Sequence, residues 1–365
     1  MTTIHSPGED IKGVLPTAEE IAAKYPANIS KIAQDRKETR AIIEGIDHRL
    51  LALFGPCSAW PFAAMPHFAD KAARLQERVN ERVKIIIRTV IQKPRTRLRK
   101  KDWEGPMKQP DPLKPPDLIL GTELCAAMMK NLSDRIASGD EMLFTHNGRT
   151  FDPYISYLWM GARSTTDSEH RGMASRTRGI PFGVKHDTYG SIEVGVNGVE
   201  AVQTPQDIFL DGQWAETHGN SHGHLILRGS PDKPNYDAES IKTAARMMTG
   251  QDNYDYVIEN PSIMVDASHD NCRDFDNGKK KDPSRQLLVI RHVLQNMLEQ
   301  REGHDLVKGF MGEMFIVGGS RKIETGMDYE LGKSITDPCS PFEDMETIIQ
   351  EMADKYDQIL SKRHF

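Results

Sequence analysis

Short apolar runs recur along the chain, and most of them end in a polar or charged residue. Runs of this length, bounded by turn residues and rich in branched aliphatic side chains, predict buried strands. Eight are predicted in this way: Arg49–Phe54, the first part of Lys84–Thr96, Glu141–Thr145, Ser156–Gly161, Ile180–Lys185, His224–Arg228, Ser262–Ala267 and Leu306–Gly312. One additional strand, Asp207–Leu210, lies in a segment inserted before the sixth of them.

Helical patterns separate these strands, at Thr17–Ile46, Met65–Arg82, Leu120–Ser138, Thr165–Ala174 and Pro341–Leu360. Pro26 breaks the first pattern, and Asn28 or Ser30 can cap the helix that follows. This first pattern precedes every strand. We therefore expect a partly helical N-terminal extension over residues 1–48 and a barrel over residues 49–365.

The alternation of strands and helices is regular. Such alternation indicates an α/β protein in which parallel strands are joined by right-handed crossovers. Eight repeats without a second domain pattern favour a (β/α)8 TIM barrel over an open sheet.

The stretch Lys84–Thr96 concentrates positive charge beside a buried strand. Pro94 has no N–H to donate, so the strand ends in a cationic loop. Arg88, Lys93 and Arg95 are costly there unless an anion neutralises them. A buried Glu or Asp paired with Arg88 explains the pattern equally well.

Composition limits the partners. The 365 residues are 38% hydrophobic, and 47 basic against 53 acidic side chains give a formal charge of −6. No overall basic field attracts nucleic acid or a membrane surface, and no run of about 18 apolar residues is present. The four cysteines, Cys57, Cys125, Cys272 and Cys339, are too scattered for a disulfide framework. We expect a cytoplasmic protein.

Cationic residues stand at or near the ends of several predicted strands, namely Arg88, Lys93, Arg163, Lys185 and Arg228. In a barrel these ends meet on one face, where such folds place their active sites. Five charges around one cavity suit a small molecule that carries phosphate and carboxylate groups. A structural ion-pair network is the alternative, and it is disfavoured because most of these strand ends lack an adjacent carboxylate.

A second set offers metal ligands: Cys57, His269, Glu313 and Asp337. One thiolate, one imidazole and two carboxylates suit a borderline divalent ion such as Mn, Fe, Co or Zn. Taken singly, Cys57 is more typical of a buried small hydrophobe and His269 of a core histidine. Their shared position at strand or loop ends favours a metal site.

Several motifs resemble those of the class I 3-deoxy-D-arabino-heptulosonate 7-phosphate (DAHP) synthases of the shikimate pathway. The matching stretches occur in the family's order and cover nearly the whole chain: Gly55-Pro56-Cys57-Ser58, Lys93-Pro94-Arg95-Thr96, Gly161-Ala162-Arg163-Ser164-Thr165-Thr166 with His170-Arg171, Gly183-Val184-Lys185, Ile226-Leu227-Arg228-Gly229 with Pro234-Asn235-Tyr236, Asp266-Ala267-Ser268-His269 and Gly332-Lys333-Ser334-Ile335-Thr336-Asp337. The resemblance implies a metal-dependent transferase that condenses phosphoenolpyruvate with erythrose 4-phosphate and water.

The resemblance also implies residue roles, position by position. Arg88, Lys93, Ala162, Arg163, Lys185 and Arg228 would bind phosphoenolpyruvate; Lys93, Pro94, Arg95 and Thr96 would bind erythrose 4-phosphate; Cys57, His269, Glu313 and Asp337 would bind one divalent metal; and Lys93, His269 and Cys57 would serve catalysis. A homodimer or homotetramer is expected.

Departures from the family pattern lie near the acceptor site. Arg97 replaces the usual second Thr, Ala59-Trp60 replaces a common His-Asp, and of residues 98–110 only Trp103 and Gly105 match. A modified aldose phosphate therefore stays open as the acceptor, as do the octulosonate phosphate branch and a barrel without catalysis that serves as a regulatory partner. Residues 97–116 are interpreted as a functional loop or lid.

Two further expectations concern regulation. Arg176-Thr177-Arg178-Gly179 and a short loop between Leu210 and His224 differ from the regulated enzymes, so weak or absent inhibition by Phe, Tyr or Trp is expected. Cys339 is placed near Cys57, which makes oxidative inactivation a hypothesis beside the simpler interpretation of an inert buried thiol. His218, His222 and His224 are interpreted as part of a solvated loop and not as a metal cluster.

Overall fold

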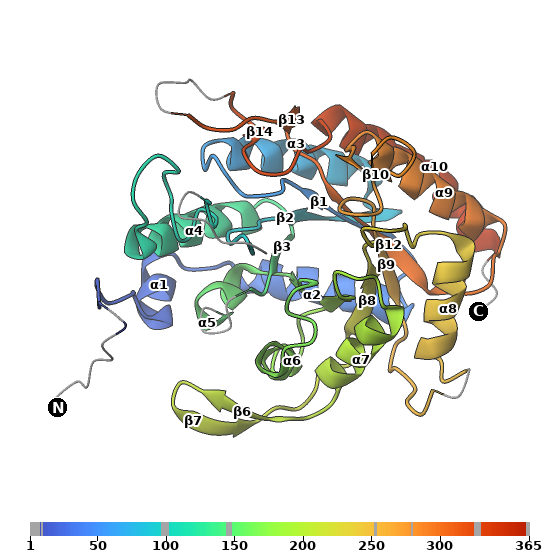
Figure 1. The fold of residues 1–365 in the computed structure, drawn as a ribbon, viewed down its shortest axis with the longest axis horizontal. Helices are drawn as coiled ribbons and strands as arrows, with labels where there is room; N and C mark the ends of the chain where they lie inside the picture. The colour runs from blue at the N-terminus through green and yellow to red at the C-terminus, as the bar shows by residue number, and fades with distance from the viewer. Residues whose placement is uncertain are drawn as a thin grey trace.

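The computed structural model describes residues 8, 10–95, 102–143, 148–251, 254–278, 280–324 and 330–362. Eight parallel strands form a closed barrel in the order β1-β12-β9-β8-β5-β4-β3-β2 (Figure 1). Their bounds are β1 Leu50–Gly55, β2 Val83–Arg88, β3 Ser138–Glu141, β4 Tyr157–Met160, β5 Phe182–Lys185, β8 Gly223–Leu227, β9 Ile263–Asp266 and β12 Val307–Glu313. The predicted (β/α)8 barrel is therefore confirmed.

Helices surround the strands (Figure 1). They are α1 Ala18–Lys24, α2 Ile29–Glu44, α3 Ala64–Val79, α4 Leu118–Ser133, α5 Gly148–Phe151, α6 Ser168–Ser175, α7 Ile192–Gln203, α8 Ala238–Met248, α9 Arg285–Leu298 and α10 Phe342–Lys362, with short 3-10 turns η2 Asp152–Tyr154 and η3 His304–Leu306. None of the described helices is both long and apolar enough to cross a membrane.

Alternate residues of each barrel strand face opposite sides, as the geometry of a strand requires. In β1, Leu51 and Leu53 belong to the core inside the barrel, whereas Leu50, Ala52 and Phe54 pack against the outer helices. Both faces are thus covered, which explains why β1 and β2 are buried along their whole length.

The N-terminal extension closes the amino end of the barrel. Ile42 and Ile43 of α2 join the apolar core inside the barrel. Ser262, just before β9, donates its hydroxyl to the carbonyl of Ile43 over 2.9 Å. Asn28 caps α2 through a hydrogen bond to the N–H of Lys31, as predicted. Access to the barrel interior is therefore left to the carboxyl ends of the strands.

Besides the barrel, the described residues form three small two-stranded sheets. They are β6 Asp207–Leu210 with β7 Gln213–Glu216, β10 Arg273–Asp274 with β11 Lys280–Lys281, and β13 Val317–Ser320 with β14 Lys333–Ser334. The first is the predicted insertion before the sixth barrel strand, and Figure 1 shows it projecting away from the barrel. The second and third were not predicted.

The two predicted boundaries on either side of residue 138 are wrong. The third barrel strand is Ser138–Glu141 and not Glu141–Thr145, whose residues 144 and 145 lie outside the described part of the chain. Helix α4 ends at Ser133 and not at Ser138. Ser138-Gly139-Asp140-Glu141 carries no β-branched side chain, and Gly139 is required by proximity: a Cβ there would lie 2.8 Å from the carbonyl oxygen of Tyr157.

Candidate active site

A cavity of about 400 Å³ opens at the carboxyl ends of the barrel strands. Its lining includes nearly all of the predicted site residues: Arg88, Lys93, Pro94, Arg95, Ala162, Arg163, Lys185, Arg228, His269, Glu313 and Asp337. Thr96, with the neighbouring Arg97, lies outside the described residues. The prediction that these strand ends meet at one face is confirmed.

Strand alternation explains why these side chains converge. Ile86 and Met311 face the barrel interior, so the residues two positions later on the same strands, Arg88 and Glu313, face it too. The same step leads from Ile226 to Arg228. At the carboxyl end of these three strands, a charged side chain therefore occupies the next interior position after an apolar one.

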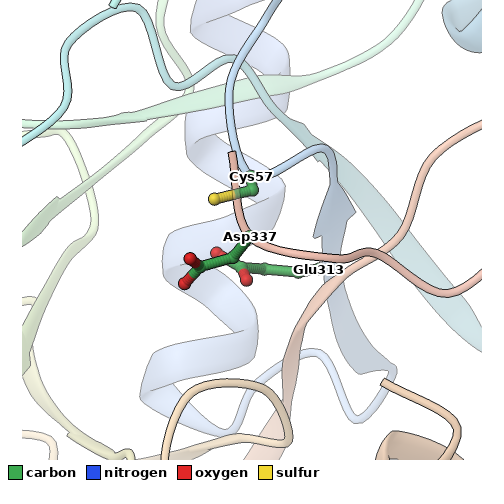
Figure 2. Close-up of side chains that lie close together, drawn as sticks. All are labelled: Cys57, Glu313 and Asp337. Carbon is green, nitrogen blue, oxygen red and sulfur yellow. The ribbon is translucent and has the colours of Figure 1, made fainter. Parts of the chain in front are cut away.

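Cys57, Glu313 and Asp337 approach one another closely (Figure 2). One ligand atom from each lies within 4.8 Å of the others. Cys57 follows β1, Glu313 ends β12 and Asp337 follows β14. Three of the four predicted metal ligands are therefore gathered from distant parts of the sequence.

His269, the fourth predicted ligand, lies beside this group. Its Nε2 is 3.8 Å from Glu313 Oε1, and its Nδ1 is 2.8 Å from Asp266 Oδ2. Burial lowers the pKa of His269 to about 4, so the imidazole is neutral at neutral pH. A carboxylate behind one ring nitrogen leaves the other available, as in many metal-binding histidines.

The charge states of the donors fit a divalent cation. Burial raises the pKa of Glu313, but nearby positive groups, Arg88 among them, lower it overall. Lys281, ion-paired with Asp337, helps hold the pKa of that carboxyl well below its ordinary value despite burial. Two ionised carboxylates, a neutral imidazole and a thiol form a donor set that a borderline metal prefers.

Lys93 contacts the thiol directly. Its Nζ lies 3.1 Å from Cys57 Sγ and donates to the Cys57 carbonyl over 2.6 Å. Burial alone lowers the pKa of Lys93, but Cys57 and Glu313 outweigh that effect and raise it. The ammonium is thus charged and fixed at the cavity wall.

Arg88 carries the clearest sign of a missing partner. It is 1% exposed, and its Nη2 lies 3.3 Å from Glu313 Oε1. Its Nε and Nη1 are buried and have no hydrogen-bond partner among the described residues. Buried guanidinium donors left unpaired are expensive, so an anion in the adjoining cavity is expected to bind them.

The premise that most of the cationic strand ends lack an adjacent carboxylate is wrong, because Arg88, Lys185 and Arg228 each pair with one. Lys185 Nζ lies 2.8 Å from Asp266 Oδ2, and Arg228 Nη2 lies 2.6 Å from Asp270 Oδ2. Both carboxylates come from the end of β9 or the loop after it, so proximity in the sequence did not reveal them. Their position around His269 is the only signal that the sequence offered.

Other residues of the cavity wall were also missed. Glu141, Arg273 and Lys281 line the cavity. The indole N–H of Trp159 donates to Glu141 over 3.3 Å. Arg273 and Lys281 sit on the β10–β11 hairpin, whose short strands carry no apolar pattern from which they could be predicted.

The interpretation of the other histidines needs correction. His224 belongs to β8 and is fully buried, and its Nε2 lies 2.6 Å from the Tyr157 hydroxyl. His222 Nε2 lies 2.6 Å from Glu44. A solvated loop is therefore wrong for His224, which lies inside the strand that the sequence also predicted from this residue onward.

Cys339 contacts Cys57, as the sequence predicted. The N–H of Cys57 donates to Cys339 Sγ over 3.4 Å, and both cysteines are buried. Burial raises the pKa of each thiol, which favours the inert form. Oxidative inactivation stays a hypothesis.

The fold and the cavity define a class: a (β/α)8 barrel with a cavity lined by Lys and Arg and a cluster of metal-type ligands at the carboxyl ends of its strands. The family model of the DAHP synthetase I family matches residues 24–351. The chain therefore belongs to this family, as the sequence motifs indicated, and is a DAHP synthase-type enzyme.

Individual proteins that resemble this chain support the same family assignment. The chain is 31% identical over 353 residues to the Trp-sensitive phospho-2-dehydro-3-deoxyheptonate aldolase of Escherichia coli strain K12, covering 94% of this chain and 95% of that protein. It is 30% identical over 355 residues to the corresponding aldolase of Corynebacterium glutamicum, covering 93% and 91%. The solved structure of the Francisella tularensis enzyme matches with a TM-score of 0.85 at 26% identity, over 96% of this chain and 99% of that one.

Proposed function

We propose that this protein condenses phosphoenolpyruvate with erythrose 4-phosphate and water, giving DAHP and inorganic phosphate, the first step of the shikimate pathway. Family membership over most of the chain supports this reaction. The observation that carries it is Arg88, whose unpaired buried donors face a cavity lined by further cations. Such a wall suits a substrate that bears both carboxylate and phosphate.

Phosphoenolpyruvate is proposed to lie along this wall. Arg88 and Lys93 would bind its carboxylate, and Arg163, Lys185 and Arg228, with Ala162 beside them, its phosphate. All six residues line the cavity. Lys185 is paired with the buried carboxylate of Asp266, which fixes this cation before substrate binds, and Arg228 is paired with Asp270.

Erythrose 4-phosphate is proposed to bind at Lys93, Pro94, Arg95 and Thr96. Arg95 Nε donates to the Trp103 carbonyl over 2.9 Å, and the Trp60 indole donates to the Pro110 carbonyl over 3.0 Å. The described part of the predicted lid, residues 102–116, is thus fastened to the barrel. It fixes one side of the acceptor site.

Cys57, His269, Glu313 and Asp337 would hold one divalent ion, Mn, Fe, Co or Zn. When bound, such an ion supplies a Lewis acid for the aldehyde oxygen of the acceptor. The neutral imidazole and the two ionised carboxylates are already in the states that metal binding requires.

The chain's own residues account for the rest of the chemistry. C3 of the enol attacks the aldehyde carbon, positive charge develops at C2, and water adds there. The resulting phosphohemiketal releases phosphate by cleavage of its C–O bond. Arg163, Lys185 and Arg228 stabilise the departing phosphate, because charged donors fixed in a buried site act on the charge as it develops.

The alternative functions considered from the sequence are less well supported. The family match disfavours an octulosonate-type enzyme, and the retained ligand group and cations disfavour a barrel without catalysis. A modified acceptor sugar, a homodimer or homotetramer and a cytoplasmic location stay predictions. The same holds for weak inhibition by aromatic amino acids, although several relatives are named Trp-sensitive.

Phosphate release from phosphoenolpyruvate tests the proposal, measured with a panel of aldose phosphates. Activity should require erythrose 4-phosphate, be lost with a chelator and return on adding a divalent ion. Adding Phe, Tyr or Trp to the same assay tests inhibition. Activity with another aldose alone, or full activity in chelator, would contradict the assignment.

Variants of the cavity wall localise the reaction. Arg163→Ala and Arg228→Ala should lower kcat/KM for phosphoenolpyruvate by about a hundredfold or more, mainly through KM. Arg135→Ala is the matched control, because Arg135 pairs with Asp70 on the outer surface, away from the cavity. Unchanged kinetics in either cavity variant would remove the proposed binding site.

A further inference from the structure

The β10–β11 hairpin brings two cations to the cavity that the sequence did not predict. Arg273 and Lys281 are paired directly across the hairpin, and both line the cavity. Arg273 is bound to Asp270, and Lys281 is bound to Asp337. The hairpin is thus tied to the active site through two carboxylates.

Asp270 is the link between the hairpin and the barrel. It is 3% exposed, and its Oδ2 lies 2.6 Å from Arg228 Nη2. Its Oδ1 accepts a hydrogen bond from Arg273 Nε. The N–H groups of Asp270 and Asn271 each donate to the Arg228 carbonyl over 3.2 Å. These backbone hydrogen bonds fix the Asp270 carboxylate in its position between the guanidinium groups of Arg228 and Arg273.

This arrangement has an electrostatic consequence for Arg228. A buried Arg228–Asp270 pair is neutral by itself, and its carboxylate would repel a phosphate in the same cavity. The Asp270 carboxylate is ion-paired with both Arg228 and Arg273. With Arg273 added, the three side chains carry a net charge of +1 beside the cavity.

The charged residues that line the cavity also indicate that the hairpin cations contribute to substrate binding. Among the described residues, eight that line it are Lys or Arg and four are Asp or Glu. The two proposed substrates together carry about five negative charges at neutral pH, since a phosphate monoester carries roughly two. The hairpin supplies two of these eight cations, so without it half of the positive excess of the described lining would be lost.

We propose that Arg273 is a positioning residue for phosphoenolpyruvate. Its guanidinium balances the negative charge of Asp270, so that the positive charge of Arg228 is not cancelled and can attract the substrate phosphate. This inference rests on the proposed function. It assigns to the β10–β11 hairpin a part in recognising the substrate, although the hairpin lies outside the barrel strands.

Arg273→Gln tests the proposal, with Lys280→Gln as the matched control. Lys280 is exposed, lies on the same hairpin and is absent from the cavity lining, so both variants remove one positive charge. Arg273→Gln should raise KM for phosphoenolpyruvate by about tenfold, with kcat and KM for erythrose 4-phosphate changing less than about threefold. Lys280→Gln should match the wild type, and Arg273→Lys should retain most of the affinity.

A second substitution separates electrostatics from folding. If Arg273 acts by neutralising Asp270, then adding Asp270→Asn to Arg273→Gln should restore the KM for phosphoenolpyruvate to within about threefold of the wild type. A purely structural hairpin contact predicts instead that the two substitutions accumulate losses.

The outcomes distinguish this inference from the proposed function. An active wild type with equal KM values in Arg273→Gln and Lys280→Gln overturns the inference and leaves the condensation in place. Failure of the double variant to recover also overturns it. A wild type that neither binds phosphoenolpyruvate nor releases phosphate from it overturns both.

Discussion

At the scale of single residues, the buried pair of Tyr157 and His224 inside the barrel shows how polar atoms are accommodated there. The Tyr157 hydroxyl donates to His224 Nε2 over 2.6 Å, and His224 Nδ1 donates to the His222 carbonyl over 2.9 Å. Both ring nitrogens are thus satisfied in the neutral tautomer. Burial lowers the pKa of His224 to about 4.

This pair makes stability depend on pH. The unfolded chain protonates His224 near pH 6.5, whereas the folded protein resists protonation until about pH 4. Its stabilising contribution is therefore complete above pH 6.5 and is lost as the pH falls toward 4, by about 1.4 kcal/mol for each pH unit. Urea unfolding of the wild type and His224→Gln across this range should give a shallower slope for the variant.

Loss of an imidazole as such is controlled by His67→Gln, at an exposed site on α3. Equal slopes for the wild type and His224→Gln would contradict the expected role of His224. The comparison concerns slopes only, because His224→Gln also lowers the stability at every pH by disturbing Tyr157.

Residue identities at strand ends were readable from the sequence, but their partners were not. Arg88, Lys185 and Arg228 follow apolar runs, so strand alternation predicts that they face the cavity. Asp266 and Asp270 pair with cations on other strands. Such pairs form only once the barrel closes, and no short-range pattern encodes them.

At the scale of elements, α2 is joined to β2 by a buried ion pair. Lys84 Nζ lies 2.6 Å from Asp35 Oδ1 and 3.0 Å from Glu38 Oε2, and Lys84 is 6% exposed. Burial raises the pKa of Glu38, but the charge of Lys84 helps lower it to about 2. The pair fixes the helix across the amino end of the barrel.

Lys84→Met should therefore destabilise the protein by about 2–3 kcal/mol, because it leaves the buried carboxylate of Asp35 with Lys31 as its one ion-pair partner among the described residues. Lys130→Met is the control, since Lys130 pairs with Asp134 at a more exposed site and should cost about 0.5 kcal/mol or less. Denaturant midpoints provide the measurement. Equal losses of unfolding free energy in the two variants would show that the buried pair adds no more stability than the exposed pair.

Elements with a strong apolar pattern were predicted well, and elements defined by tertiary contacts were not. Val83–Arg88 contains three consecutive isoleucines and was identified as a strand. Ser138–Glu141 has no such pattern and is a strand because its neighbours β2 and β4 pair with it. The hairpin of Arg273 and Lys281 likewise depends on contacts across the active site.

At the scale of the whole molecule, the division into an extension and a barrel can be tested by truncation. Residues 10–15 are exposed, so removing residues 1–16 should leave the melting temperature nearly unchanged. Removing residues 1–48 should abolish cooperative unfolding. Ile32, Ile42 and Ile43 would be lost from the core, each worth about 1.5–3 kcal/mol, against a total stability of about 5–15 kcal/mol.

Thermal unfolding followed by circular dichroism measures both truncations. A chain of residues 49–365 that melts cooperatively near the wild-type temperature would show that the barrel folds independently of α2. A large loss from removing residues 1–16 alone would instead assign the stabilising role to the segment before α1.

The helix that seals one end of the barrel separates two kinds of evolutionary constraint. Changes at the sealed end disturb Ile42, Ile43 and the apolar interior, and so are selected against through folding. Changes at the opposite rim, such as a lengthened or recharged β10–β11 hairpin, alter what the cavity accepts while leaving that interior intact. New substrate preferences can therefore arise in this lineage by drift and selection at the rim, on a scaffold that stays the same.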